Sequence, residues 1–141
     1  MANQRNIGRW AKLAGIAITT AMMMQLPGQS FASNAASIKG NWVGTGQVKL
    51  QSGNQERVSC RVKYGRIAGQ EFSVVARCAT SGTHIDQSGQ LKRLSADRYV
   101  GNIHNEQFNV TARVTVTVSG GRQTVSISSD QGSATLRLQR R

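Results

Sequence analysis

Alternation of apolar and polar residues is the feature of this sequence that most limits its fold. Between positions 108 and 118 every second residue is apolar or small, and the residues between them are polar. Successive side chains of a β-strand point to opposite faces, so a period of two predicts a strand with one buried face. After Trp42 the chain shows no apolar pattern at helical spacing. We therefore expect an all-β fold.

The same alternation recurs along the chain, separated by clusters of turn-forming residues. We predict eight strands near residues 41–50, 55–65, 71–80, 83–92, 97–104, 107–118, 122–129 and 133–140. Eight short antiparallel strands must hide their apolar faces, and closure of the sheet also removes edges that favour aggregation. We therefore expect a small eight-stranded antiparallel up-and-down β-barrel, with a two-sheet β-sandwich as the alternative.

The N-terminal region has the composition of a secretory signal peptide. Arg5, Arg9 and Lys12 form a basic segment without acidic residues, and residues 13–26 are almost wholly apolar. This apolar run is shorter than the roughly 18 residues that a helix needs to cross a bilayer. We expect the chain to be exported and the signal to be removed.

The signal peptide sets the expected domain organisation. Residues 1–32 are the predicted signal, with cleavage after Ala32 and Ala35 as the second choice. Residues 33–40 are then a flexible N-terminal segment and residues 41–141 a single β-barrel domain. Removal of the signal takes away three of the 18 Lys and Arg and none of the 6 Asp and Glu, so the net charge falls from +12 to +9.

The two cysteines of the chain, Cys60 and Cys78, both lie in the exported part. In an oxidising compartment they are expected to form one disulfide, which stabilises a small domain by about 3 kcal/mol. If they are directly opposite each other in an antiparallel pair, Tyr64 lies opposite Val74 and all these side chains face inward.

The same register test applies to the first hairpin. A turn centred on Gly53 places Val48 opposite Val58 and Trp42 opposite Tyr64. Two glycines of the first strand, Gly44 and Gly46, then face the interior. They would either make room for the disulfide or leave a void.

Basic residues gather on the outer face that this register predicts. Lys49 is expected opposite Arg57, and Arg61 opposite Arg77, with Lys63 beside them. Like charges across two strands are mildly destabilising, so the cluster suggests a surface for an anionic partner. Such a partner would be lipopolysaccharide, a phospholipid head group, an acidic polysaccharide or an acidic protein. The alternative is a basic surface that serves solubility.

Other classes of function have weaker support in the sequence. His84 with Asp86, and His104 with Glu106, have the spacing of paired metal ligands, but nothing brings the two pairs together. No serine lies in a nucleophile elbow, so we expect no catalytic residues. We also expect no metal and no cofactor. Nucleic acid is not expected, because the chain is predicted to be exported and its few aromatic residues mostly have the inward parity. A barrel interior rich in Val, Ala and Gly leaves open a cavity for a small apolar ligand.

The first and last strands carry a resemblance to a known superfamily. The Gly40-Asn41-Trp42 opening and the final Thr135-Leu136-Arg137-Leu138 strand resemble those of the calycins, the lipocalin-like and avidin-like barrels. This resemblance implies that Trp42 closes one end of the barrel beneath an arginine of the last strand, Arg137 or Arg140, of which we choose Arg137. Such a cation–π contact contributes about 0.5–2 kcal/mol.

The overall layout also resembles small periplasmic barrels of Gram-negative bacteria that inhibit secreted metalloproteases, and small envelope proteins of alphaproteobacteria. These likenesses imply a periplasmic location. Our expectation is a non-enzymatic periplasmic protein that binds anionic envelope components through its basic outer face. The alternatives are a carrier of a small apolar ligand and an inhibitor of a secreted protease or lysozyme.

Overall fold

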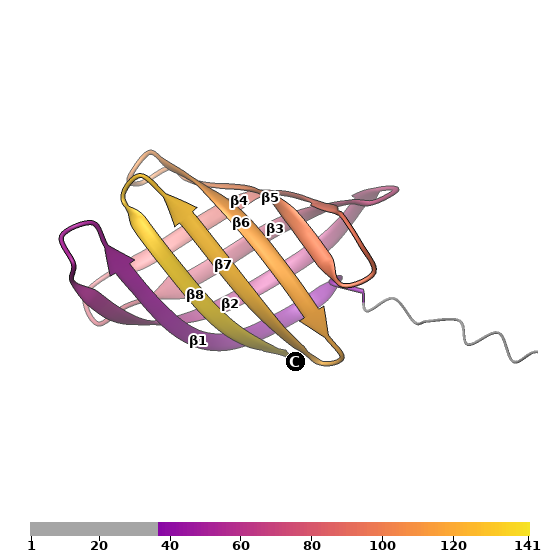
Figure 1. Ribbon diagram of the computed structural model, residues 1–141, viewed down its shortest axis with the longest axis horizontal. Coiled ribbons are helices and arrows are strands. Elements are labelled where there is room, and N and C mark those ends of the chain that lie inside the picture. Colours follow the sequence, from indigo (N-terminus) through magenta and orange to yellow (C-terminus); the bar gives the residue numbers. More distant parts are fainter. Residues whose placement is uncertain (1–36) are drawn as a thin grey trace, which may run out of the picture. The chain divides into compact units, whose positions relative to one another are not determined.

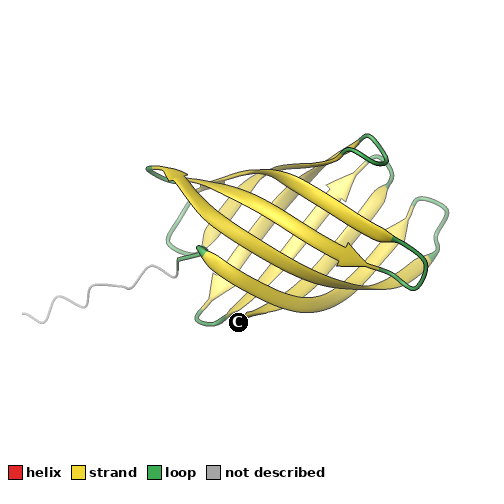
Figure 2. Ribbon diagram, turned by 180° about the vertical axis from the view of Figure 1, so that it is seen from behind, coloured by secondary structure: helices red, strands yellow, loops and turns green. Residues whose placement is uncertain are grey.

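The computed structural model describes residues 37–141. The expected signal peptide and its cleavage site lie outside the described residues. The strands are β1 (Gly40–Leu50), β2 (Gln55–Ala68), β3 (Glu71–Ala79), β4 (His84–Arg93), β5 (Arg98–Asn105), β6 (Val110–Ser119), β7 (Arg122–Ser129) and β8 (Gly132–Arg140). Each strand pairs with its neighbours in the chain, as Figures 1 and 2 show.

The sheet is closed, because β1 pairs antiparallel with β8 as well as with β2. The predicted eight-stranded antiparallel up-and-down barrel is therefore confirmed, and the two-sheet sandwich is excluded. Among residues 37–141 there is no helix with the length and hydropathy that a membrane-spanning helix requires.

The period of two in the sequence separates the inside of the barrel from the outside. In β6 the buried positions are Ala112, Val114, Val116 and Val118, and the residues between them are more exposed. The expected inward position of Phe108 is wrong, since this side chain is 53% exposed. The strand begins only at Val110 because a preceding turn places Asn109 at a φ of 50°.

The register predicted from the two cysteines is confirmed. Cys60 and Cys78 lie directly opposite each other in β2 and β3 and form a disulfide, with Cα atoms 4.1 Å apart. Tyr64 lies opposite Val74. The disulfide therefore joins two adjacent strands inside the barrel.

The register predicted for the first hairpin is wrong by two residues. Trp42 lies opposite Val62, and Val48 lies opposite Glu56. The turn causes this difference, because the Gly53 N–H donates to the Leu50 oxygen and Gly53 itself has a φ of 90°. A glycine in this conformation after a tight turn is characteristic of a three-residue hairpin loop. A shift of two keeps every side chain on its expected face and changes only its cross-strand neighbours.

Glycines allow neighbouring strands to approach each other closely at two places. A Cβ atom at Gly44 in β1 would lie 2.0 Å from the Arg137 oxygen of β8. A Cβ atom at Gly101 in β5 would lie 1.9 Å from the Gln90 oxygen of β4. Glycine positions of this kind let a twisted sheet coil tightly enough to close.

Replacement of Gly44 by alanine tests this account of closure. Since the added methyl group would meet the β8 backbone, Gly44→Ala should lower the free energy of unfolding by about 3 kcal/mol. Gly82→Ala is the control, because nothing lies within 4 Å of a Cβ atom at that position. Denaturant unfolding measures both variants, and equal stability of the two would contradict the role given to Gly44.

Candidate functional site

The outer face of β1, β2 and β3 brings basic and apolar side chains together. Arg61 on β2 lies directly opposite Arg77 on β3, which confirms that part of the predicted register. On its other side Arg61 lies opposite Val43 of β1. The neighbouring row across the same strands consists of Asn41, Lys63 and Val75.

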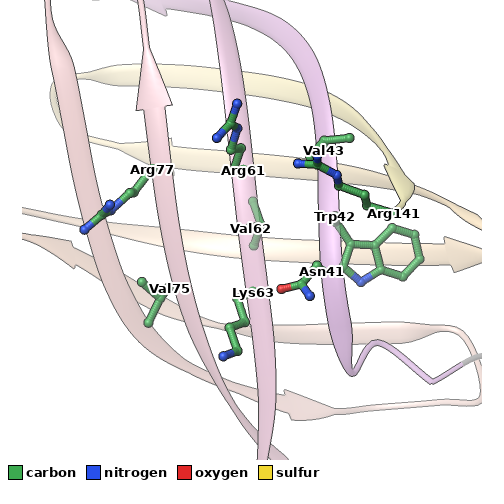
Figure 3. Close-up of a pocket in the computed structure, with 9 residues that line it drawn as sticks. All are labelled: Asn41, Trp42, Val43, Arg61, Val62, Lys63, Val75, Arg77 and Arg141. Carbon is green, nitrogen blue, oxygen red and sulfur yellow. The ribbon is translucent and has the colours of Figure 1, made fainter.

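A hollow of about 490 Å³ lies over these strands, and we call it the basic hollow. It is lined by Asn41, Trp42, Val43, Arg61, Val62, Lys63, Val75, Arg77 and Arg141. Figure 3 shows Arg61 and Lys63 on the central strand, with Arg77 on one side of them and Arg141 beside Val43 on the other. The C-terminal residue reaches this position because the Arg141 N–H donates to the Asn41 oxygen at 3.0 Å.

Positive charge in the basic hollow is only partly neutralised. Arg77 and Asp86 of β4 form an ion pair at 3.5 Å, and both side chains are largely exposed. Among residues 37–141 the structure contains no other ion pair between side chains. Arg61, Lys63 and Arg141 therefore keep their charge without a carboxylate partner in the described chain. An anion placed among them would relieve the repulsion between Arg61 and Arg77.

Two of the residues predicted for the anion-binding surface lie elsewhere. Lys49 is opposite Gln55, and Arg57 is opposite Gln47, so the predicted Lys49–Arg57 pair is wrong. The physical reason is the two-residue shift that the Gly53 turn imposes on the first hairpin. Both residues lie toward the far end of β1 and β2 and neither lines the basic hollow.

Sequence reasoning missed the apolar part of the hollow and its C-terminal residue. Val75 has the outward parity of β3 and is 52% exposed, so an apolar residue at a polar position was a signal available in the sequence. Val43 has the outward parity of β1 in the same way. Arg141 had no such signal, because its position depends on the pairing of β8 with β1.

Trp42 seals the end of the barrel at which both described chain ends lie. Its ring is fully buried, and the guanidinium carbon of Arg140 lies 4.4 Å from the ring centroid. The choice of Arg137 for this contact is therefore wrong. Trp42 is directly opposite Arg140 in the β1–β8 register, whereas Arg137 has the outward parity and lies opposite Thr45.

The segment before β1 forms part of this seal. Ile38 is fully buried, its carbonyl accepts a hydrogen bond from Trp42 Nε1 at 2.8 Å, and its N–H donates to the Tyr99 hydroxyl at 3.3 Å. Arg140 donates to the carbonyl oxygens of Lys39 and Ser37. These contacts place residues 37–40 of the predicted N-terminal segment against the barrel. The rest of that segment lies outside the described residues.

Large side chains of the protein itself occupy the interior of the barrel. Trp42, Tyr99, Ile38, Leu91 and Val116 are the largest fully buried residues. Two hollows, one over β1–β3 and one over β3–β5, are lined mainly by outward-facing residues.

A polar pair lies inside the barrel. The Tyr64 hydroxyl donates to Gln123 Oε1 at 3.1 Å, and both residues are buried. Burial raises the pKa of the Tyr64 phenol above its ordinary value, since the charged form would lose its hydration. Tyr64 is therefore a neutral hydrogen-bond donor.

The two pairs with metal-ligand spacing have other contacts. Asp86 pairs with Arg77, and His104 Nδ1 lies 2.9 Å from the Thr111 hydroxyl. Within residues 37–141 no group of three or more His, Cys, Asp or Glu side chains has the arrangement of a metal site.

Solved β-barrels are similar to this chain in structure. The redesigned barrel mFAP1, solved with DFHBI bound, is 20% identical with a TM-score of 0.64, over 76% of this chain and 98% of that one. A de novo designed fluorescence-activating β-barrel is 15% identical with a TM-score of 0.60, over 76% and 96%. Rv2717c from M. tuberculosis is 10% identical with a TM-score of 0.51, over 73% and 92%.

At such low identities these likenesses show the fold alone, which is a small closed eight-stranded antiparallel β-barrel. No family model and no curated protein matches the sequence.

Substitution of the two candidate arginines separates their roles. Arg140→Gln should lower the free energy of unfolding by about 2 kcal/mol, because it removes the contact with Trp42 and the hydrogen bonds to residues 37 and 39. Arg137→Gln is the control at an exposed position and should change stability by less than about 0.5 kcal/mol. Chemical denaturation followed by tryptophan fluorescence measures both. Equal effects would contradict the assignment of Arg140 as the closing residue.

Proposed function

We propose that this protein is a non-enzymatic binding protein of the cell envelope that holds an anionic component in the basic hollow. The observation that carries this proposal is the grouping of Arg61, Lys63 and Arg141 around one hollow without carboxylate partners in the described chain. Arg77 completes the cationic lining. The candidate ligands are lipopolysaccharide, a phospholipid head group or an acidic polysaccharide, with an acidic protein as a further partner.

The composition of the hollow suits a ligand with both charged and apolar surface. Arginine donates paired hydrogen bonds to phosphate and carboxylate groups, and lysine supplies a point charge. Val43 lies opposite Arg61 and Val75 lies opposite Lys63, and both offer apolar contact to a sugar ring or an acyl chain. Asn41 adds a neutral side chain that can both donate and accept hydrogen bonds.

The periplasm is the proposed location. The Cys60–Cys78 disulfide is compatible with an exported protein, because such bonds persist in oxidising compartments. We also propose a calycin-like relationship. It is supported by the Gly40-Asn41-Trp42 opening and by the arginine that lies over Trp42.

Charge removal in the hollow tests the proposed function. The double variant Arg61→Gln/Arg77→Gln should bind a soluble oligogalacturonate, used as an anionic polysaccharide probe, at least about tenfold more weakly than the wild type. Its affinity for lipopolysaccharide should fall by the same factor. Titration calorimetry at low and high salt measures both, and the wild-type affinity should fall as salt increases.

The control has the same change in net charge at another place. Lys49→Gln/Arg57→Gln removes two cations that do not line the hollow, and it should leave binding within about twofold of wild type. Equal loss in both double variants would indicate attraction to net charge alone. That result, or unchanged binding in the Arg61→Gln/Arg77→Gln variant, would contradict the assignment of the hollow as the site.

A carrier of a small apolar ligand is the second candidate function. It is favoured by the likeness to mFAP1, which was solved with DFHBI bound. Against it, the interior of this barrel is occupied by Trp42, Tyr99 and Leu91.

Native mass spectrometry distinguishes the carrier from the surface binder. Protein purified gently from the periplasm should have the mass of the disulfide-bonded chain with no retained small molecule, because packed side chains fill the barrel. A retained apolar molecule would instead support the carrier. In that case the adduct should persist at high salt, where binding to the basic hollow is screened.

A further inference from the structure

The two ends of the barrel differ in which loops they present. One end carries the β2–β3, β4–β5 and β6–β7 turns together with Ser37 and Arg141, as the ribbon in Figure 1 shows for the turns and the C-terminus. The opposite end carries the other four hairpin turns. We call the first of these the basic end, for the reason given next.

Charge is divided unequally between these ends. The comparison covers the turns, the chain ends and the three terminal residues of each strand. The basic end then has eight Lys or Arg and two Asp or Glu. The opposite end has three Lys or Arg and four Asp or Glu. The cations nearest the turns of the basic end include Arg66, Lys92, Arg93, Arg98, Arg122 and Arg141. A molecule with this distribution is oriented by a negatively charged surface, with the basic end toward it.

Two large apolar side chains are exposed in the turns of the basic end. Ile67, at the end of β2, is 48% exposed, and Leu94, just after β4, is 60% exposed. Exposed apolar residues at the tips of adjacent hairpins, surrounded by cations, are the features that let a protein enter the boundary between lipid head groups and acyl chains.

Hydrogen bonds hold the two tips in place and next to each other. The Arg93 N–H donates to the Gln70 oxygen at 2.9 Å, which ties the β4–β5 turn to the β2–β3 turn. The Arg93 guanidinium donates to the Ser95 and Ala96 oxygens, and Arg66 Nε donates to the Gly69 oxygen. The apolar side chains are therefore presented by ordered turns, and little conformational entropy is lost when they meet a surface.

We propose that the basic end is a docking surface for anionic lipid bilayers, with Ile67 and Leu94 inserted at the interface and the surrounding cations on the head groups. Attraction to an anionic leaflet grows with each Lys or Arg held near the membrane. Apolar insertion then adds a contribution that salt does not screen. This surface shares Arg141 with the basic hollow but has its own apolar residues, and it does not depend on the proposed function.

The opposite end provides a matched control within the same molecule. Leu50 is 38% exposed and Phe108 is 53% exposed, so they resemble Ile67 and Leu94 in exposure and apolar character. The three cations at that end, Lys49, Arg57 and Arg77, are outnumbered by its four carboxylates. The opposite end therefore has exposed apolar residues without the surplus of cations.

Cosedimentation with vesicles tests the proposal. The wild type should partition onto phosphatidylcholine vesicles that contain phosphatidylglycerol and only weakly onto phosphatidylcholine alone. Ile67→Ser/Leu94→Ser, which keeps the net charge, should reduce partitioning about tenfold. Leu50→Ser/Phe108→Ser should change it by less than about twofold. Unchanged binding of the first variant, or equal loss in both, would overturn the proposal.

Insertion also has a spectroscopic test that does not rely on loss of binding. Leu94→Trp should show a blue shift of its emission when phosphatidylglycerol vesicles are added, because the indole enters a less polar environment. Phe108→Trp should show none. An unshifted Leu94→Trp spectrum on sedimenting protein would rule out insertion of this turn.

The vesicle experiments and the oligogalacturonate titration test different residues, so their results can be told apart. Ile67→Ser/Leu94→Ser should retain the wild-type affinity for oligogalacturonate, and Arg61→Gln/Arg77→Gln should retain the blue shift at Leu94→Trp. If only the vesicle experiments fail, the docking surface is contradicted and the anion site in the hollow still stands. If only the polysaccharide titration fails, the anion site is contradicted and the docking surface still stands.

Discussion

Closure of the sheet brings the backbones of β1 and β8 so close that a Cβ atom at Gly44 would lie 2.0 Å from the Arg137 oxygen. The pairing of β1 with β8 makes the sheet continuous, from Trp42 opposite Arg140 to Leu50 opposite Gly132. Once the sheet is continuous, the parity of each strand decides which side chains lie inside and which lie outside. It also brings the C-terminal arginines to the first strand. The seal over Trp42 and the rim of the basic hollow are both consequences of this single strand pairing.

Interior packing limits where the molecule can act. The disulfide joins β2 to β3 inside the barrel, and Trp42 and Ile38 close one end from within. Residues of this size leave the interior to the protein's own side chains, as expected for a narrow eight-stranded barrel. The side chains that remain unpaired and charged are on the outside. Binding is therefore best sought on the outer surface.

The sequence predicted the fold and one edge of the site, and it failed where no residue pair constrained the register. Alternation identified the strands, and the requirement that Cys60 meet Cys78 established the β2–β3 register and the Arg61–Arg77 pair. The first hairpin had no such constraint, and the conformation of Gly53 shifted its register by two residues. Lys49 and Arg57 were misplaced for that reason. The choice of Arg137 over Arg140 was also wrong. The alternation with Leu136 and Leu138 gives Arg140 the inward parity, whereas its place directly opposite Trp42 depends on closure of the sheet.

Arg141 connects the hollow with the basic end, because it lines the first and belongs to the second. The two surfaces meet at Arg141, so their cations contribute to one electrostatic field along this side of the barrel. Arg77 is the cation of the hollow that lies toward the opposite end. Carboxylates are instead concentrated toward the opposite end, where Glu56, Glu106 and Asp130 lie. A field with this direction presents the basic end and the hollow to an anionic surface in the same orientation. A protein docked through Ile67 and Leu94 would consequently hold its hollow beside the membrane surface. In that position an anionic group of an envelope molecule could reach Arg61 without leaving the interface.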